Sequence, residues 1–192
     1  MNSQPVIIYI SAAPDLTTER ETLARMIAEL PVTLAWRIVQ TPTGAEQLDT
    51  AALLKADLYF LVMGGDIRAP VGLELHTAQR AGKPVNAYLQ RGSGYTPAGQ
   101  VFIRQAGLTW QPFAGAASLS RHIRRRIVEH LVRHAIEYVL SPTELSQLET
   151  LLTAEAGAEP AASAEGAGHS AVILSRERYT PSEGVIVEGK KG

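Results

Sequence analysis

The segment Asp57-Leu-Tyr-Phe-Leu-Val-Met63 is the most apolar stretch of the chain and restricts the possible folds most strongly. Such a run is typical of a central parallel strand that is covered on both faces. Shorter strand-like segments lie at 6–11, 33–39, 84–89 and 108–113. Segments of helical pattern separate these strands with short links, and this alternation predicts a parallel sheet with right-handed crossovers.

The expected helices fill the intervals between these strands and follow the last one. They are predicted over 15–30, 44–55, 71–81, 98–106 and 118–140, with a brief continuation over 143–146. Asp15 and Ser118 are expected to cap the first and the last long helix. The second helix offers four residues for burial: Leu48, Ala51, Ala52 and Leu54. Together these elements predict a flavodoxin-like, three-layer α/β sandwich with a five-stranded parallel sheet, over residues 1–153.

The composition of the chain changes after residue 153. Residues 154–170 are rich in Ala, Gly and Glu, cannot build a core, and predict a flexible linker. Two short apolar runs, Val172-Ile-Leu174 and Val185-Ile-Val187, then lie within 171–192. Two interpretations stay open for this last segment: a disordered tail, or a docking peptide that adds a strand to the sheet edge of a protein partner.

Composition also excludes several classes of protein. The 192 residues include no cysteine, so disulfides, thiolate nucleophiles and cysteine zinc sites are excluded. The formal net charge of −1 provides no overall field that would attract nucleic acid or an anionic membrane. The chain shows no secretory leader and no apolar stretch of about 20 residues, which predicts a cytoplasmic protein with no membrane partner. No grouping of His and carboxylates has the spacing of a metal site, so no metal is expected.

Basic residues gather in the last long predicted helix. One face of that helix is needed for the core, and scattered arginines usually form a solvated face, so a nucleic-acid partner is not expected. The arginines concerned are Arg121, Arg124, Arg125, Arg126 and Arg133.

Three segments are expected to meet at the carboxyl edge of the sheet, where doubly wound folds bind their ligands. They are 9–14 after the first strand, 64–68 after the third, and the start of the helix that carries Glu74. Gly64 and Gly65 allow the backbone to approach a ligand closely. A carboxylate near a helix N-terminus is electrostatically favoured in any protein, so an ordinary first-turn acid remains an open interpretation of Glu74.

Several of these segments resemble known families. Ile8-Tyr-Ile-Ser-Ala-Ala-Pro14, Ala56-Asp-Leu58 and Glu74-Leu-His-Thr-Ala-Gln-Arg-Ala-Gly-Lys-Pro-Val85 resemble motifs of nucleoside 2-deoxyribosyltransferases. TIR domains carry a related Glu-Leu-x-x-Ala motif after their third strand. Tyr9-Ile-Ser-Ala-Ala-Pro-Asp-Leu-Thr-Thr-Glu-Arg20 is closer still to an uncharacterised TIR-like bacterial family that opens with Phe-Ile-Ser-Ser-Thr-x-x-Asp-Leu-x-x-Glu-Arg. The resemblance covers roughly residues 5–140.

The resemblance implies binding of NAD or a related nucleotide and cleavage of its N-glycosidic bond, in bacterial signalling or defence. Such cleavage passes through an oxocarbenium-like sugar and needs a carboxylate beside the anomeric carbon. Glu74 matches the catalytic glutamate of these families, and Tyr9 matches the tyrosine that supports it. The nucleotide would be a substrate or ligand, and no further cofactor is expected. The residues expected to line the pocket are Ser11, Gly64, Gly65, Asp66 and Arg68.

The chain departs from the transferases at the position of their second carboxylate. Arg68-Ala-Pro-Val71 stands where they have Asp-x-Gly-Thr, so Asp66 is the nearest substitute. An arginine there favours a phosphorylated ligand, because its guanidinium binds phosphate in a bidentate way. The missing carboxylate also favours an alternative: a non-catalytic signalling or scaffold module that self-associates and is tethered through its C-terminal tail. Asp15, Glu19 and Arg20 match the bacterial family, yet helix capping with an exposed ion pair is the commoner role of such residues.

Overall fold

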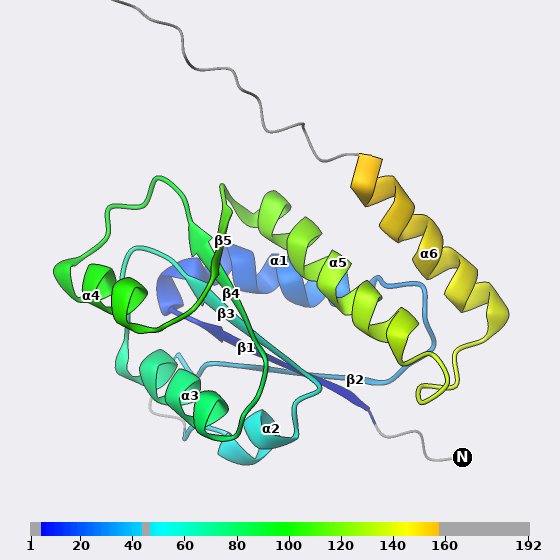
Figure 1. Cartoon of the computed structure of the whole chain (residues 1–192), viewed down its shortest axis with the longest axis horizontal. Coiled ribbons are helices and arrows are strands. Elements are labelled where there is room, and N and C mark those ends of the chain that lie inside the picture. Colours follow the sequence, from blue (N-terminus) through cyan, green and yellow to red (C-terminus); the bar gives the residue numbers. More distant parts are fainter. Residues whose placement is uncertain (1–4, 44–46, 158–192) are drawn as a thin grey trace, which may run out of the picture. The chain divides into compact units, whose positions relative to one another are not determined.

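A computed structural model describes residues 5–43 and 47–157 of the chain. Five strands form one sheet, in which all neighbours are parallel and the order is β2-β1-β3-β4-β5 (Figure 1). This arrangement confirms the predicted flavodoxin-like α/β fold. The strands are β1 (Val6–Ala12), β2 (Trp36–Gln40), β3 (Leu58–Met63), β4 (Val85–Gln90) and β5 (Trp110–Phe113).

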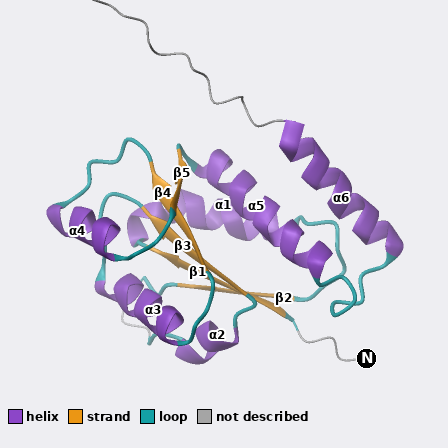
Figure 2. Cartoon of the chain, in the orientation of Figure 1, coloured by secondary structure: helices purple, strands orange, loops and turns teal. Residues whose placement is uncertain are grey.

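Helices cover both faces of this sheet, with α1 and α5 on one side and α2 and α3 on the other (Figures 1 and 2). A 3-10 turn, η1 (Pro14–Leu16), leads into the first of them. The helices are α1 (Thr17–Ala28), α2 (Thr50–Lys55), α3 (Ala69–Arg80), α4 (Pro97–Gln105), α5 (Ala116–Arg133) and α6 (Pro142–Gly157). Among the described residues, no helix is both long enough and apolar enough to cross a membrane.

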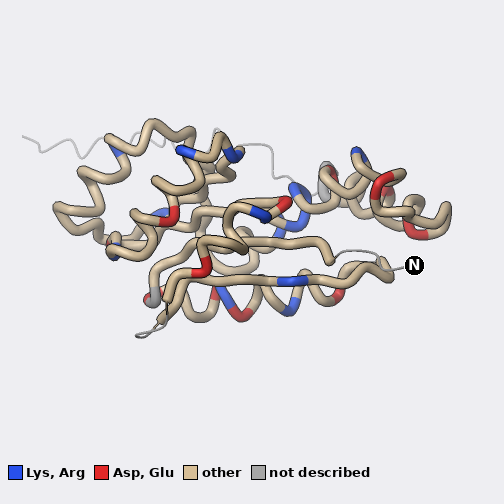
Figure 3. Tube along the Cα trace, turned by 90° about the horizontal axis from the view of Figure 1, so that it is seen from below, with Lys and Arg blue, Asp and Glu red and all other residues tan. Residues whose placement is uncertain are grey.

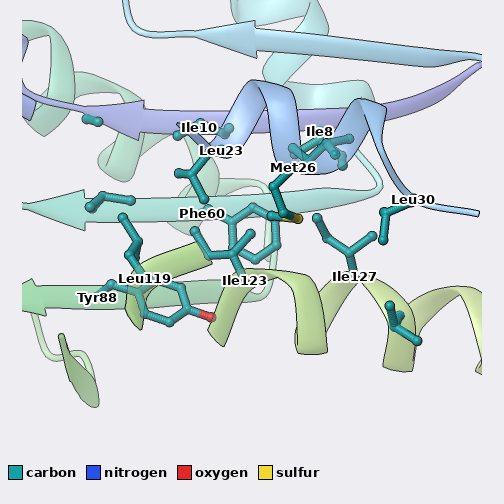
Figure 4. Close-up of a cluster of buried hydrophobic side chains, with 14 of the residues drawn as sticks. Ile8, Ile10, Leu23, Met26, Leu30, Phe60, Tyr88, Leu119, Ile123 and Ile127 are labelled. Atoms are coloured by element: carbon teal, nitrogen blue, oxygen red, sulfur yellow. The ribbon is translucent and has the colours of Figure 1, made fainter. Parts of the chain in front are cut away.

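The two faces of β1 belong to two different cores, because successive side chains of a strand point to opposite faces. Ile8 and Ile10 face α1 and α5, where Figure 4 shows them beside Phe60. Tyr9 lies between them in the sequence and packs on the other face, in the core formed with α2 and α3. This second face positions the site described below.

The second helix is shorter than predicted. It begins at Thr50 instead of Gly44, because the Asp49 side chain caps it by accepting a hydrogen bond from the Ala52 amide at 2.8 Å. Leu53 is buried and Leu54 is 50% exposed, so the predicted burial of Leu54 was wrong; Ala51 is exposed as well. Residues 44–46, also predicted to be helical, lie outside the described part of the chain.

Both predicted caps of the long helices were wrong. Asp15 lies within η1, and its side chain makes no capping hydrogen bond to α1. Ser118 lies within α5, where its hydroxyl accepts a hydrogen bond from the Ala114 amide at 3.0 Å. The same helix ends at Arg133 instead of about Leu140. The turn that follows contains Val139 with a φ of 53°, which lies in the left-handed region and outside the right-handed α-helix.

The last helix, α6, is longer than the predicted continuation over 143–146. Ser141 and Glu144 form a capping box, in which the Ser141 amide donates to Glu144 Oε2 at 2.8 Å and the Glu144 amide donates to Ser141 Oγ at 3.3 Å. Leu148 is fully buried in the core beneath α1 and α5. Residues 154–157, predicted as the start of the linker, are therefore helical, while 158–192 lie outside the described residues.

Candidate functional site

The carboxyl ends of β1 and β3 meet where the strand order changes direction. The chain leaves the carboxyl end of β1 towards β2 on one side, and it leaves the carboxyl end of β3 towards β4 on the other. In flavodoxin-like sheets of this order, this junction is the usual place for a ligand. Tyr9 and Ser11 reach it from β1, and Glu74 reaches it from the helix that follows β3.

Glu74 accepts hydrogen bonds from three hydroxyl groups and is fully buried. The Tyr9 hydroxyl donates to Glu74 Oε1 at 2.7 Å. The hydroxyls of Ser11 and Thr41 both donate to Oε2, the second at 2.6 Å. We call Tyr9, Ser11, Thr41 and Glu74 the Glu74 cluster. The structure thus brings together the expected catalytic pair Glu74 and Tyr9 with the expected pocket residue Ser11, and adds Thr41.

Local sequence explains how the cluster forms. Tyr9 and Ser11 are two residues apart on β1 and therefore share the face that packs against α3. Pro70 stands at the start of α3, where its missing N–H costs nothing. The buried face of that helix consists of Val71, Glu74, Leu75 and Ala78. One polar residue in an otherwise apolar face is thereby carried into the core, where three hydroxyl groups donate hydrogen bonds to it.

Burial dominates the electrostatics of the cluster. Loss of water raises the pKa of the Glu74 carboxyl above its usual range, and the three donated hydrogen bonds together with the Arg20 charge oppose that rise. The pKa of the Tyr9 phenol is also raised, first by burial and then by its hydrogen bond to Glu74. Tyr9 therefore remains a protonated donor throughout the physiological range.

Thr41 is a member of the cluster that sequence reasoning missed. It directly follows β2, is 2% exposed, and its amide donates to the Ile10 carbonyl at 3.2 Å. Its hydroxyl accepts from the Ala12 amide at 3.0 Å while donating to Glu74. A single threonine after a strand matches no motif. The available signal was its place at the carboxyl end of a neighbouring strand, at the same edge as Ser11.

Arg20 also belongs beside the cluster, and its interpretation as part of an exposed ion pair was wrong. Its Nε donates to Gln40 Oε1 at 2.8 Å, and its Nη2 donates to the Thr41 carbonyl at 2.6 Å. The third nitrogen, Nη1, is buried and has no hydrogen-bond partner in the described structure. Burial lowers the pKa of this guanidinium, and the charge of Glu74 opposes the change.

The two glycines after β3 accommodate the protein's own chain. A Cβ atom at Gly64 would lie 2.8 Å from Asp15 Oδ2 and 3.2 Å from a methyl carbon of Leu16. A Cβ at Gly65 would lie 3.1 Å from the Gly94 carbonyl oxygen. The close backbone approach predicted at Gly64-Gly65 therefore exists, but in this structure it is made by η1 and by the loop before α4.

Asp66 and Arg68 stand apart from the Glu74 cluster. Asp66 Oδ1 accepts hydrogen bonds from the hydroxyl of Thr96, the N-cap residue of α4, and from the Ile67 amide at 2.8 Å. The Thr96 hydrogen bond is the main cause that lowers the pKa of Asp66. Arg68 is the exposed N-cap residue of α3 and has an extended backbone. Within residues 5–43 and 47–157, no hydrogen bond joins either side chain to Glu74.

Tyr59 adds a second buried phenol next to the cluster. Its ring centroid lies 6.0 Å from that of Tyr9, and its hydroxyl is buried with no hydrogen-bond partner of suitable geometry in the described structure. Burial raises its pKa, and the nearby Ser11 hydroxyl opposes the rise. Among the described residues, no group of His, Asp and Glu could hold a metal ion. The chemistry available here is that of a carboxyl group held by hydroxyls.

The arginines predicted to make the last long helix basic lie on α5. Arg125 Nε and Arg126 Nη1 each lie 3.1 Å from a carboxylate oxygen of Glu129, so their charges are partly balanced. Figure 3 shows acidic and basic positions interspersed over the described chain. The expectation that nucleic acid is not a partner stays a prediction.

Two comparisons with known proteins found no relative of this chain. No protein-family model matches the chain, and a search of curated proteins finds no match either. The sheet order is consistent with flavodoxin-like and TIR-like folds. A closer relationship rests on the quoted motifs alone.

Proposed function

We propose that residues 5–157 form a nucleotide-binding TIR-like domain that cleaves the N-glycosidic bond of NAD or a related nucleotide. The observation that carries this proposal is the Glu74 cluster at the junction of β1 and β3, because a carboxylate at a ligand-binding edge is the group such a reaction needs. Glu74 is the catalytic carboxylate, and Tyr9 holds its Oε1. Ser11 and Thr41 hold the other oxygen.

In the proposed reaction with NAD, the bond between ribose C1′ and the nicotinamide nitrogen breaks. Its electron pair leaves with the nitrogen, which becomes neutral, and positive charge develops on the sugar. The Glu74 carboxylate stabilises that charge. Water then adds to C1′ and releases one proton, so the products are ADP-ribose, nicotinamide and H⁺. Since Glu74 is fully buried here, the sugar must replace at least one of its hydroxyl partners to reach it.

Nicotinamide release by the purified full chain tests the proposal. Glu74→Gln should lower the rate at least about 100-fold, the scale of a lost charge-stabilising or proton-transferring group. Glu149→Gln is the matched control, because Glu149 is exposed on α6, and it should keep the wild-type rate. Equal rates in wild type and Glu74→Gln would refute the catalytic role.

One observation favours a second function. Glu74 has no exposed surface and both its oxygens are occupied, as in a polar network that only supports the fold. A non-catalytic scaffold module, self-associating and tethered through its C-terminal segment, fits that observation. No nicotinamide release at high protein concentration, together with a mass in light scattering that rises with concentration, would support this alternative.

Arg68 tests the ligand class. It is exposed at the N-terminus of α3, beside the carboxyl edge of β3, where a phosphate can be bound. Arg68→Ala should weaken binding of a nucleotide by roughly 1.5–3 kcal/mol, the scale of a charge-assisted hydrogen bond, and barely affect a free nucleoside. Equal losses for both ligands in calorimetry would contradict a phosphate contact.

A further inference from the structure

We propose that Arg20 is a positioning residue for Glu74: it holds the chain at Thr41 and thereby keeps the Thr41 hydroxyl on the Glu74 carboxylate. The inference rests on the role proposed for Glu74, since it describes how that side chain is held ready. It concerns a residue of α1 that is far from Glu74 in the sequence and makes no hydrogen bond to it.

The first step is the attachment of Arg20 to the end of β2. Nη2 donates to the Thr41 carbonyl at 2.6 Å, and Nε donates to the side chain of the preceding residue, Gln40, at 2.8 Å. Gln40 Nε2 in turn reaches the Arg20 carbonyl at 3.4 Å. A planar guanidinium thus holds two consecutive residues, which fixes the direction in which the chain leaves the strand.

The second step runs from Thr41 to Glu74. A threonine hydroxyl has one hydrogen to donate and lone pairs to accept. Here the Ala12 amide occupies an acceptor position at 3.0 Å, so the hydrogen is directed to Glu74 Oε2 at 2.6 Å. This geometry exists only while the backbone at Thr41 stays in place. Arg20 holds the carbonyl of the same residue, so displacement of Arg20 moves the donor away from Glu74.

The third step is electrostatic. Arg20 is partly buried, and its Nη1 is enclosed with no hydrogen-bond partner in the described structure. The attraction between this charge and Glu74 favours the ionised carboxylate. An ionised Glu74 is the form that accepts three hydroxyl donors and stabilises a cationic sugar. Arg20 therefore acts on both the geometry and the charge of the same group.

Arg25 provides a matched control on the same helix. It is also an arginine of α1, but it is exposed and its side chain makes no hydrogen bond within the described residues. Arg25→Gln changes the net charge of the protein as much as Arg20→Gln does. Any difference between the two variants therefore reports the position of Arg20 and not the loss of one positive charge.

The experiment is an NMR titration of the full chain with ¹³C-labelled glutamate carboxyl groups, the Glu74 signal being assigned through Glu74→Gln. Arg20→Gln should raise the pKa of Glu74, because the variant removes both the Arg20 charge and the attachment that holds Thr41. Arg25→Gln should leave the Glu74 pKa unchanged. Arg20→Lys keeps the charge but cannot hold Gln40 and Thr41 together, so it should still raise the Glu74 pKa, by less than Arg20→Gln does. Amide spectra show whether each variant is folded, and if Arg20→Gln is not, the comparison of Arg20→Lys with Arg25→Gln decides.

The same Glu74 pKa in wild type, Arg20→Gln and Arg25→Gln would overturn the proposal. The titration needs no substrate, so its outcome is independent of turnover. A shifted pKa without nicotinamide release from the wild type would refute the proposed function and leave the positioning role intact. If the wild type does release nicotinamide, Arg20→Gln should move the acidic limb of the profile of kcat against pH to higher pH, with KM unchanged. An acidic limb at the wild-type pH would contradict the role of Arg20.

Discussion

Glu74 and Glu144 both accept several hydrogen bonds, but their pKa values are shifted in opposite directions. Glu144 accepts from the amide and hydroxyl of Ser141 at 2.8 and 2.7 Å, and from the amide and hydroxyl of Thr33 at 2.6 and 2.8 Å. These four bonds lower its pKa to about 2. Glu74 accepts three, yet its pKa is raised. The difference is water, because Glu144 lies at the surface and Glu74 is fully buried.

The comparison separates two uses of a carboxylate. At Glu144 the bonds join α6 to the loop before β2, and the ionised group is stable without further help. At Glu74 such hydrogen bonds compensate only part of the lost hydration. The pKa of this carboxyl therefore changes readily when a charged or polar group approaches it. Sensitivity of this kind is common at functional sites, although structural networks also produce it.

The largest effect is expected for Thr41→Val, which keeps the shape of the side chain and removes its hydroxyl. The Ala12 amide loses its acceptor and Glu74 loses a donor, both in a buried place, so the free energy of unfolding should fall by about 2–3 kcal/mol. Urea unfolding measures it. Thr77→Val is the control. Among the described residues the Thr77 hydroxyl bonds only the Leu73 carbonyl of its own helix, so its loss should lower the free energy of unfolding by no more than about 0.5 kcal/mol. Similar losses of unfolding free energy in the two variants would show that the buried hydrogen bonds of Thr41 stabilise the fold no more than an exposed one does.

Glu144→Ala should have a smaller effect, about 1 kcal/mol, which is typical for loss of a helix cap. The bonds broken lie at the surface, where water replaces them. Glu149→Ala, an exposed change on the same helix, should be close to neutral. A loss at Glu144 that equals or exceeds the loss at Thr41 would show that burial does not separate the two regions.

The sequence predicted the layers and the centre of the site because these depend on local patterns. The apolar run 57–63 became β3, and the spacing of Tyr9 and Ser11 placed both on one face of β1. Glu74 was identified from its place at the start of the helix after the third predicted strand and from its match to the glutamate of the families that the chain resembles. The layers needed only the periodicity of strands and helices, whereas the site residues also needed the family motifs.

What the sequence did not predict depends on contacts between distant segments. Arg20 follows Glu19 and so suggested an exposed ion pair, whereas its true partners lie at 40–41, on another strand. Thr41 gains its role only when β2 aligns beside β1. The extent of α6 is a different case, because the capping-box pattern Ser-x-x-Glu at 141–144 was present and indicated a helix start. The Ala- and Glu-rich residues after it were interpreted as a linker, although both are good helix formers.

Glu144 should make the stability of the protein depend on pH in the acidic range. The pKa of its carboxyl is lower in the folded protein than the unfolded value of about 4.3. The stability that Glu144 contributes is therefore present above about pH 4.3 and is lost as the pH falls towards 2. Glu144→Gln should therefore lose less stability than wild type between pH 5 and pH 3. Unfolding free energies at several pH values measure this, and parallel curves for the two proteins would contradict the lowered pKa.

The smallest effect is expected at Glu74, whose pKa is shifted in the opposite direction from that of Glu144. It is measured as the difference between two curves of unfolding free energy against pH. Its folded pKa lies above the unfolded value of about 4.3, so the folded state binds more protons over the interval between them. The contribution of Glu74 is therefore fully present below about pH 4.3 and declines as the pH rises through the folded pKa. Relative to Glu74→Gln, which cannot titrate, wild type should lose stability as the pH increases from 4.3 towards neutrality. A wild-type advantage that instead grows with pH over this range would show that the hydroxyls and Arg20 outweigh burial, and Glu74 would then behave like Glu144.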